Sequence, residues 1–226
     1  MHTTLAQCPK CHKKNRLIEQ PRVASYRCGS CHEPLANPFC YFFFDCETTG
    51  LPKSKNTPFL VQLAWEIYDA DKRLLGRKDY LVRPDGYTIP RSSTSVHGIT
   101  HDQALASGVP LQYAIAQLLA DTNRPAIRMV AHNLQFDARI IGVEAQRAGL
   151  RFSFDGRFVY CTMINTVKVC RIPKRGGGHK WPSLLELHQH LFGSRFNEAH
   201  NARCDVRATA DCFFELRKHD LLKFDD

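Results

Sequence analysis

Two carboxylates stand two positions apart at the end of an aromatic segment that runs from Tyr41 to Glu47. If this segment is a β-strand, alternation puts Asp45 and Glu47 on one face together with Phe43. The opposite face then receives Phe42, Phe44 and Cys46. Burying two carboxylates on so apolar a strand is costly unless a cation neutralises them, although an Asp-x-Glu pair alone is a weak motif. The pattern therefore indicates a metal site where this strand ends.

A third acid lies near the start of a predicted helix. Residues 126–131 form a second apolar run that is typical of a buried strand, and it stops at His132. Asn133 is suited to cap a helix over 134–148, which carries Asp137 in its first turn. An acid in a first turn also complements the helix dipole, so Asp137 taken alone has a structural explanation.

A fourth acid belongs to a final helix, predicted from about Ala202 to Leu222. Asp205 lies at its start on the inward side, and His200 lies five residues earlier. An inward acid needs a partner, and a neighbouring histidine can serve merely as its hydrogen-bond mate. Each acid therefore has an ordinary explanation, and only their ordered combination points to a shared site.

Four cysteines near the N-terminus form two Cys-x2-Cys pairs separated by sixteen residues. They are Cys8, Cys11, Cys28 and Cys31. This is the spacing of a structural zinc ribbon, and metal binding must supply the folding energy of so short a segment. A redox motif would need one such pair within a βαβ unit, which is not predicted here. His12 and His32 adjoin the pairs, but four thiolates already complete a zinc shell.

The elements that position these residues fall into two units. We expect a four-cysteine zinc ribbon over residues 1–37 and an α/β domain over residues 38–226, with a linker around Pro34 to Pro38. Strands are expected near residues 41–46, 59–69, 73–83, 126–131 and 157–160. The acids would then converge from the end of the first strand and the starts of two helices.

Three segments, taken in order, closely resemble the three signatures of the DEDDh exonucleases. These are 3′–5′ exonucleases that include the proofreading epsilon subunit of DNA polymerase and ribonuclease T. The segments are Phe44-Asp-Cys-Glu-Thr-Thr-Gly50, His132-Asn-Leu-Gln-Phe-Asp137 and His200-Asn-Ala-Arg-Cys-Asp205. The resemblance covers about residues 41–222. One departure is Cys161-Thr162, where many relatives have Asp-Thr, but that Asp is not a metal ligand of the family. The ribbon alone also resembles the one that precedes some bacterial thioredoxins.

The resemblance implies a ribonuclease H-like fold, a five-stranded mixed sheet flanked by helices. It implies that Asp45, Glu47, Asp137 and Asp205 hold two Mg²⁺ or Mn²⁺ ions, and that His200 is the general base. The terminal nucleotide would be bound by Thr48, Thr49, Gly50 and Leu51, with His97, Asn133 and Phe136 lining the same cleft. We therefore predict an exonuclease that uses two metal ions to release nucleoside 5′-monophosphates from 3′ ends of single-stranded nucleic acid, with DNA favoured. The alternative is a catalytically silent nucleic-acid-binding adaptor on the same scaffold.

The formal charge of +9 is concentrated in two segments. Residues 1–37 carry six Lys/Arg against two Glu, and residues 156–185 carry six Lys/Arg and no acid. Such segments favour an anionic partner such as nucleic acid, although solvated loops are the alternative. Residues 174–180, a basic run with three glycines, are expected near the cleft as a phosphate cradle or a disordered connector. The ribbon is a further candidate to dock a replication or repair protein.

The apolar runs of the chain are far shorter than the ~20 residues that a bilayer span needs, so we expect no membrane partner. No signal peptide is visible at the N-terminus. We therefore expect a cytoplasmic protein whose ten cysteines are reduced, metal-bound or buried.

Overall fold

The computed structural model describes residues 3–18, 26–52, 57–124, 126–155, 157–197 and 199–222. The strands are β1 (Thr3–Gln7), β2 (Lys14–Ile18), β3 (Tyr26–Arg27), β4 (Pro34–Leu35), β5 (Cys40–Thr48), β6 (Leu60–Asp69), β7 (Leu74–Leu81), β8 (Ile127–Ala131) and β9 (Phe158–Cys161). The helices are α1 (Arg91–His97), α2 (His101–Ser107), α3 (Leu111–Thr122), α4 (Leu134–Arg147), α5 (Thr162–Asn165), α6 (Val167–Cys170), α7 (Leu184–Phe192) and α8 (Ala202–Lys218). None of these helices is long and apolar enough to cross a membrane.

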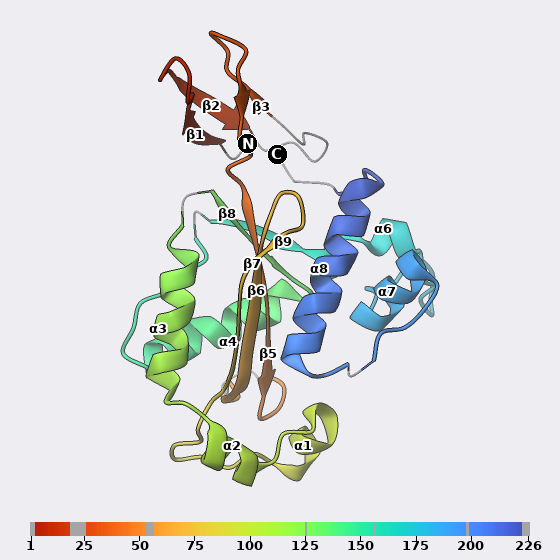
Figure 1. Ribbon diagram of the computed structural model, residues 1–226. Helices are drawn as coiled ribbons and strands as arrows, with labels where there is room; N and C mark the ends of the chain where they lie inside the picture. Colours follow the sequence, from red (N-terminus) through yellow and green to blue (C-terminus); the bar gives the residue numbers. More distant parts are fainter. Residues whose placement is uncertain are drawn as a thin grey trace.

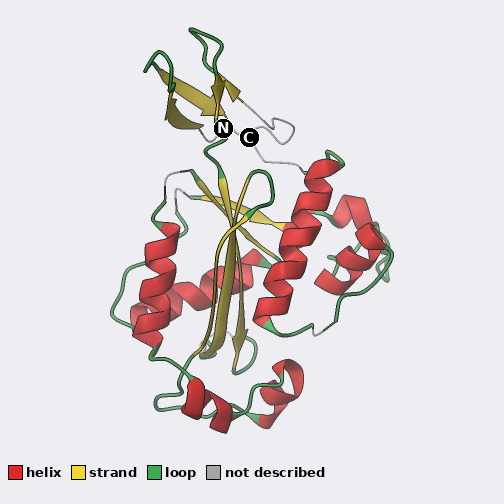
Figure 2. Cartoon of the chain, viewed as in Figure 1, coloured by secondary structure: helices red, strands yellow, loops and turns green. Residues whose placement is uncertain are grey.

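The larger unit is built on a mixed five-stranded sheet in the order β7-β6-β5-β8-β9. β5 pairs with β6 antiparallel and with β8 parallel, and β9 continues the parallel side. Helices α3 and α4 lie on one side of this sheet and α8 on the other (Figures 1 and 2). The mixed sheet flanked by helices confirms the predicted ribonuclease H-like fold.

The alternation of β5 divides the core into two layers, as its sequence predicts. Phe42 and Phe44 pack with residues of α3 and α4 in one hydrophobic cluster. Tyr41 and Phe43 pack on the other face against α8, where the rings of Phe43 and Phe213 lie 5.4 Å apart. Because β5 and β6 are covered on both faces, nearly all of their side chains are buried, which explains their almost continuous apolar sequence.

The smaller unit consists of two short antiparallel hairpins, β1–β2 and β3–β4, that carry the cysteine pairs on their turns. It lies beyond the N-terminal end of β5, at the opposite end of the molecule from α1 and α2 (Figure 1). The ring of Tyr26 on β3 contacts the ring of Phe39, and their centroids lie 6.1 Å apart. Phe39 is buried directly before β5, so this ring contact connects the ribbon to the central sheet.

Helix α4 begins at Leu134 as predicted but without the expected cap, and α8 ends four residues before its predicted end. Asn133 precedes α4, but its φ of 70° is left-handed and its side chain makes no capping hydrogen bond. The chain turns sharply between β8 and α4, and asparagine tolerates that conformation better than most residues. α8 ends at Lys218, because Asp220 turns left-handed and Leu221 N–H donates back to the Leu216 carbonyl. Leu222, the predicted helix end, is instead buried beyond this turn.

Candidate active site

Carboxylates from three elements, β5, α4 and α8, meet near the C-terminal end of β5. Oxygen atoms of Asp45, Glu47 and Asp205 all lie within 4.8 Å of one another. Asp45 and Glu47 come from β5, and Asp205 comes from the first turn of α8. Asp137, in the first turn of α4, borders the same cavity as the other three. The four acids of the sequence signatures are therefore brought together, and we call them the acidic cluster.

Asp137 is held in place by the strand that it faces. Its Oδ1 accepts hydrogen bonds of 3.1 Å from both the backbone N–H and the thiol of Cys46. Cys46 lies between Asp45 and Glu47 and points to the opposite face, so the strand presents acids on one side and this donor on the other. The pairing of Cys46 with Asp137 was not predicted from the sequence.

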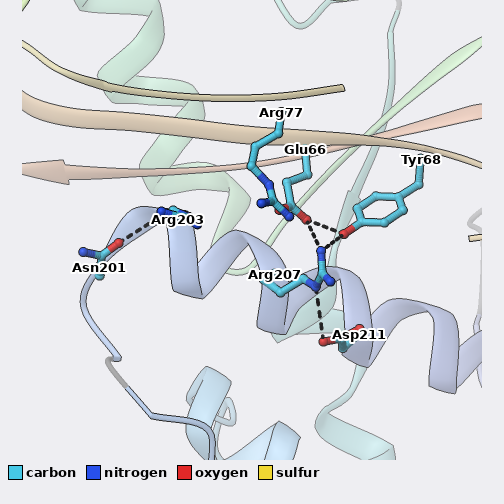
Figure 3. Close-up of polar contacts among 7 residues, drawn as sticks. All are labelled: Glu66, Tyr68, Arg77, Asn201, Arg203, Arg207 and Asp211. Carbon is cyan, nitrogen blue, oxygen red and sulfur yellow. Dashed lines mark hydrogen bonds and ion pairs between the residues drawn. The ribbon is translucent and has the colours of Figure 1, made fainter. Parts of the chain in front are cut away.

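The start of α8 is fixed by several polar contacts. Asn201 Oδ1 accepts from Arg203 N–H at 3.2 Å and caps the helix (Figure 3). Gln62 Oε1, on β6, accepts from the N–H of Ala202 at 3.1 Å. One turn into the helix, Arg207 binds the buried carboxylate of Glu66 on β6 at 3.4 Å (Figure 3). These contacts hold the segment that carries His200 and Asp205 against the sheet.

The acidic cluster is electrostatically unfavourable when no cation is bound. Burial, followed by the charge of Asp137, raises the pKa of Asp45 well above its ordinary value. Burial also raises the pKa of Glu47 to about 8, of Asp137 to about 7 and of Asp205 to about 6. Four carboxyl groups that resist ionisation together fit a site for divalent cations, which favour carboxylate oxygen.

The hydrogen bonding of Asp205 is a second observation that fits a metal site. Its Oδ2 accepts from the backbone N–H of His200 at 3.0 Å. Its Oδ1 is buried and has no hydrogen-bond partner among the described residues. A buried carboxylate oxygen without a donor is unfavourable in a protein interior, and a bound cation would satisfy it. The donor set therefore fits a divalent metal.

His200 lies on the exposed rim of the cluster. Its φ is 67°, a left-handed conformation that is uncommon for residues other than glycine. Strained backbone of this kind is often retained where a side chain must be aimed at a site. The residue borders the same cavity as Asp45 and Glu47.

A cavity of about 540 Å³ opens over the acidic cluster, and we call it the acidic cavity. Of the predicted substrate-binding residues, it is lined by Thr48, Gly50, Leu51, His97, Asn133 and Phe136. Thr49 does not line it. Its Oγ1 accepts from the N–H of Phe59 at 3.0 Å, and both residues border a neighbouring hollow.

The wall of the acidic cavity also contains residues that the sequence analysis did not assign. Val96, Met163, Ser183 and Leu184 contribute to it, together with His132. Burial lowers the pKa of His132 to about 4, so its imidazole is neutral. Its Nε2 lies 3.1 Å from the carbonyl of Pro182, which can only accept, so Nε2 carries the proton. No local pattern could have brought these residues together, because they come from separate parts of the chain.

A larger hollow of about 710 Å³ lies elsewhere, beside the C-terminal end of α4. Its buried acid is Glu144, which is already paired with Arg147 at 2.7 Å and with the N–H of Leu60 at 3.0 Å. A carboxylate that is already satisfied by these two donors is poorly suited to chemistry. The acidic cavity is therefore the candidate active site.

The four ribbon cysteines form a second ligand cluster. Their sulfur atoms lie within 4.8 Å of one another, with Cys8 to Cys31 and Cys11 to Cys28 both at 3.5 Å. Tetrahedral zinc with bonds of ~2.3 Å separates its sulfur ligands by about 3.8 Å, so the cluster fits zinc closely. His12 and His32 occupy equivalent left-handed turn positions, and each backbone N–H donates to the carbonyl of the first cysteine of its pair.

Comparisons with known proteins identify the family to which this chain is related. Residues 42–213 match the family model described as RNase_T, Exonuclease. A DNA polymerase III subunit epsilon-like protein of Rhodobacter capsulatus is 30% identical over 179 residues, and a PolC-type DNA polymerase III of Streptococcus suis is 29% identical over 190 residues. These matches cover 78% and 80% of this chain. The chain spans only 23% and 12% of those relatives.

Solved structures share the fold. Exonuclease I of E. coli in complex with a dT13 oligonucleotide has a TM-score of 0.67 at 19% identity, over 81% of this chain and 42% of that chain. A zinc-bound form of E. coli exonuclease I with single-stranded DNA has a TM-score of 0.65 at 20% identity, over 80% and 41%. At these identities the likeness concerns the fold, and the site must be argued from its own residues.

Proposed function

Because the chain belongs to the exonuclease family whose model spans residues 42–213, we propose that it removes nucleotides one at a time from 3′ ends of single-stranded DNA. The observation that carries this proposal is the convergence of Asp45, Glu47 and Asp205 beside Asp137 in the acidic cavity. The divalent ions that the family implies would be two Mg²⁺ or Mn²⁺ ions held by the acidic cluster, supplying an activated water and stabilising the leaving 3′ oxygen.

The residues of the chain have separate tasks in this proposal. The charges of the three other acids all help to raise the pKa of Asp45, so the ionised carboxylate of Asp45 would depend strongly on the bound cations that it helps to hold. Glu47, Asp137 and Asp205 complete the ligand set, and the Cys46 donors keep Asp137 oriented. The four negative charges balance two divalent cations, so the anionic substrate meets a neutral site rather than a repulsive one.

His200 is the proposed general base. Its exposed position on the rim allows the imidazole to take a proton from the attacking water and pass it to solvent. The hydrogen bond from its backbone N–H to Asp205 holds the residue next to a metal ligand. Loss of the imidazole should therefore slow the chemical step without removing a metal ligand.

The walls of the acidic cavity suit a terminal nucleotide. Leu51, Val96 and Phe136 supply apolar surface for the face of a base, and Thr48 and Asn133 add polar groups for the sugar and phosphate. E. coli exonuclease I is known in complex with dT13 and dA16 oligonucleotides, which supports single-stranded DNA as the substrate class. A silent adaptor is the weaker proposal, because every acid of the three signatures is present at the cavity.

The ribbon is proposed to hold one structural Zn²⁺ through its four thiolates. The resemblance to a polymerase III epsilon-like protein supports a replication or repair setting, in which the ribbon would dock a partner protein or touch nucleic acid. A cytoplasmic location stays a prediction.

The test uses a single-stranded oligonucleotide labelled at its 5′ end. With Mg²⁺ present, a 3′–5′ exonuclease yields a ladder of shortened labelled strands, whereas the opposite polarity releases the label at once. Asp45→Asn should abolish the ladder and keep the fold, because it removes a ligand charge and little volume. Asp71→Asn, at an exposed position of the β6–β7 turn, is the matched control. Wild-type rates in Asp45→Asn would refute the two-metal assignment.

A further inference from the structure

The basic segment between α6 and α7 has a defined shape. Pro173 and His179 form an antiparallel bridge, and Lys180 N–H donates to the Ile172 carbonyl at 2.9 Å. The tip consists of residues 176–178, three glycines whose φ values lie between 76° and 99°. Glycine is favoured there because other residues rarely adopt such angles. The segment is therefore a short hairpin rather than a structureless connector, and we call residues 172–181 the Trp181 hairpin.

The Trp181 hairpin presents positive charge to solvent. Lys174 and Arg175 directly precede its glycine tip and are exposed, and neither has an ion-pair partner within the described ranges of the chain. Lys180 is paired, with its ammonium 2.6 Å from Glu186. Residues 156–185 contain no Asp or Glu, and the acids nearest to the hairpin in sequence are Glu186 and the more distant Asp155. A surface of this kind favours a polyanion.

Trp181 adds an exposed aromatic ring at the end of the same hairpin. Its side chain is 63% exposed, whereas Trp65, the other tryptophan, is fully buried in the core. An exposed indole offers a flat apolar face that a base can cover. Cations combined with an exposed aromatic ring are the usual means by which proteins bind single-stranded nucleic acid, since every base has a face that can stack.

The Trp181 hairpin is attached to the wall of the acidic cavity. The next residue, Pro182, accepts the hydrogen bond from His132, and Ser183 and Leu184 line the cavity itself. His132 is anchored in turn by the Thr162 hydroxyl at 3.0 Å. Figure 1 shows α6 and α7, which the hairpin joins, on the outer side of α8. Trp181 is two residues away from Ser183 of the cavity wall, so a strand that leaves the cavity on this side would meet the hairpin.

We propose that the Trp181 hairpin is a second binding surface for single-stranded DNA, which grips the nucleotides that precede the one being removed. A base stacks on Trp181, while Lys174 and Arg175 meet the neighbouring phosphates. This inference rests on the proposed exonuclease function for its setting, but it concerns binding and can be measured without hydrolysis.

Tryptophan fluorescence provides the direct test, using the full-length Asp45→Asn protein so that the strand stays intact. A long oligothymidylate should quench the emission of the exposed tryptophan, whereas a dinucleotide, which occupies only the cavity, should leave it unchanged. Trp181→Phe should abolish the quenching and retain most of the affinity, since phenylalanine still stacks. Trp181→Ala should weaken binding by roughly ten-fold or more. Tyr113→Ala, at another exposed aromatic, is the matched control.

The role of Lys174 and Arg175 is tested by the salt dependence of DNA binding. Lys174→Gln combined with Arg175→Gln should flatten the slope of log affinity against log salt by about 1.4, the value for two lost contacts to a single strand. The control pair, Arg73→Gln with Arg151→Gln, removes equal charge from exposed positions outside the hairpin. Equal slopes in both double variants, or full affinity in Trp181→Ala, would overturn the proposal.

The two proposals fail in different ways. Cleavage by the wild type without quenching in Asp45→Asn would leave an exonuclease whose hairpin does not bind the strand. Quenching without any cleavage by the wild type would leave a binding surface on an inactive scaffold. Unchanged melting temperatures in all variants would exclude misfolding as the cause of either result.

Discussion

Asp45 and Glu47, the two acids on either side of Cys46, show how individual side chains tie the stability of this protein to pH and metal. Asp45 and Glu47 share a face of β5 with buried aromatics, and both resist ionisation because they are buried near other acids. Their carboxylates contribute nothing to folding stability as anions. We explain their presence by the divalent cations that they are proposed to bind. The stability of the metal-free protein should therefore depend on pH.

Divalent metal should stabilise the protein more at high pH than at low pH. Unfolded carboxyl groups titrate near pH 4, whereas the folded pKa values of Glu47, Asp137 and Asp205 are about 8, 7 and 6. Between those limits the unfolded state ionises first, so the stability of the metal-free protein falls as pH rises. Mg²⁺ or Mn²⁺ binds the ionised form and reverses this loss.

Melting temperatures with and without Mg²⁺ at pH 5 and pH 8 provide the measurement. They are taken without a chelator so that the ribbon keeps its own metal. The shift should be larger at pH 8 and smaller in Asp45→Asn. A shift that is equal at both pH values would contradict the assignment.

His200→Ala should reduce kcat by ~10²–10⁴-fold, the usual contribution of general acid–base catalysis. The affinity for Mn²⁺ should change little, because His200 contacts Asp205 through its backbone N–H, which alanine retains. His190→Ala, at an exposed position of α7, serves as the control. A collapse of metal affinity in His200→Ala would instead make His200 a ligand.

At the scale of elements, the site depends on how α8 begins. Gln62 on β6 links two neighbours, because its Oε1 accepts from Ala202 N–H and its Nε2 donates to Asp79 Oδ1 at 2.8 Å. Gln62 is buried, so its hydrogen bond to Ala202 is shielded from water. We expect it to position the segment that carries His200 and Asp205.

Gln62→Leu should therefore lower kcat more than it raises KM, because the groups that move act on the reacting centre. It should also cost about 1–3 kcal/mol of unfolding free energy, since the Ala202 N–H loses its acceptor. Thr122→Val is the control, because it removes a buried hydroxyl on α3 that binds the Leu118 carbonyl. Equal loss of kcat in the two variants would show that Gln62 acts only through stability.

The elements themselves were largely predictable from the sequence, and the contacts between them were not. The strands β5, β6 and β8 are largely apolar runs, and the acids lie at or beyond their ends at recognisable spacings. The Cys46 bonds to Asp137 and the Gln62 bond to Ala202 join residues 91 and 140 positions apart. Such contacts depend on the packing of whole elements, about which a local pattern contains no information.

At the scale of the whole molecule, the ribbon and the acidic cavity lie at opposite ends of β5. The ribbon contacts Phe39, directly before the strand, and the acids follow at its other end. Asp45 and Glu47 follow Phe39 by six and eight residues, which at ~3.3 Å each separates them from the ribbon contact by about 20–26 Å. No described ribbon residue lines the acidic cavity, so we expect its chemistry to be independent of the ribbon.

Removal of residues 1–37 should leave kcat at saturating substrate nearly unchanged. If the ribbon touches nucleic acid, the truncation should weaken the affinity for a long single strand and flatten its salt dependence. With zinc bound, the net charge of residues 1–37 is only about +2, so the loss should be modest. Apparent affinities against salt, for full-length and truncated protein, provide the measurement. Identical slopes would favour a protein-docking role for the ribbon.

If the ribbon binds nucleic acid, the length of β5 sets the shortest strand that can contact the ribbon and the acidic cavity at the same time. A strand that engages the ribbon while its 3′ end lies in the cavity must span the whole sheet, and each round of digestion shortens it. A strand too short to reach both the ribbon and the acidic cavity loses its contact with the ribbon and dissociates sooner. Products of the full-length enzyme should then accumulate at one threshold size of several nucleotides, and this accumulation should vanish in the truncated enzyme.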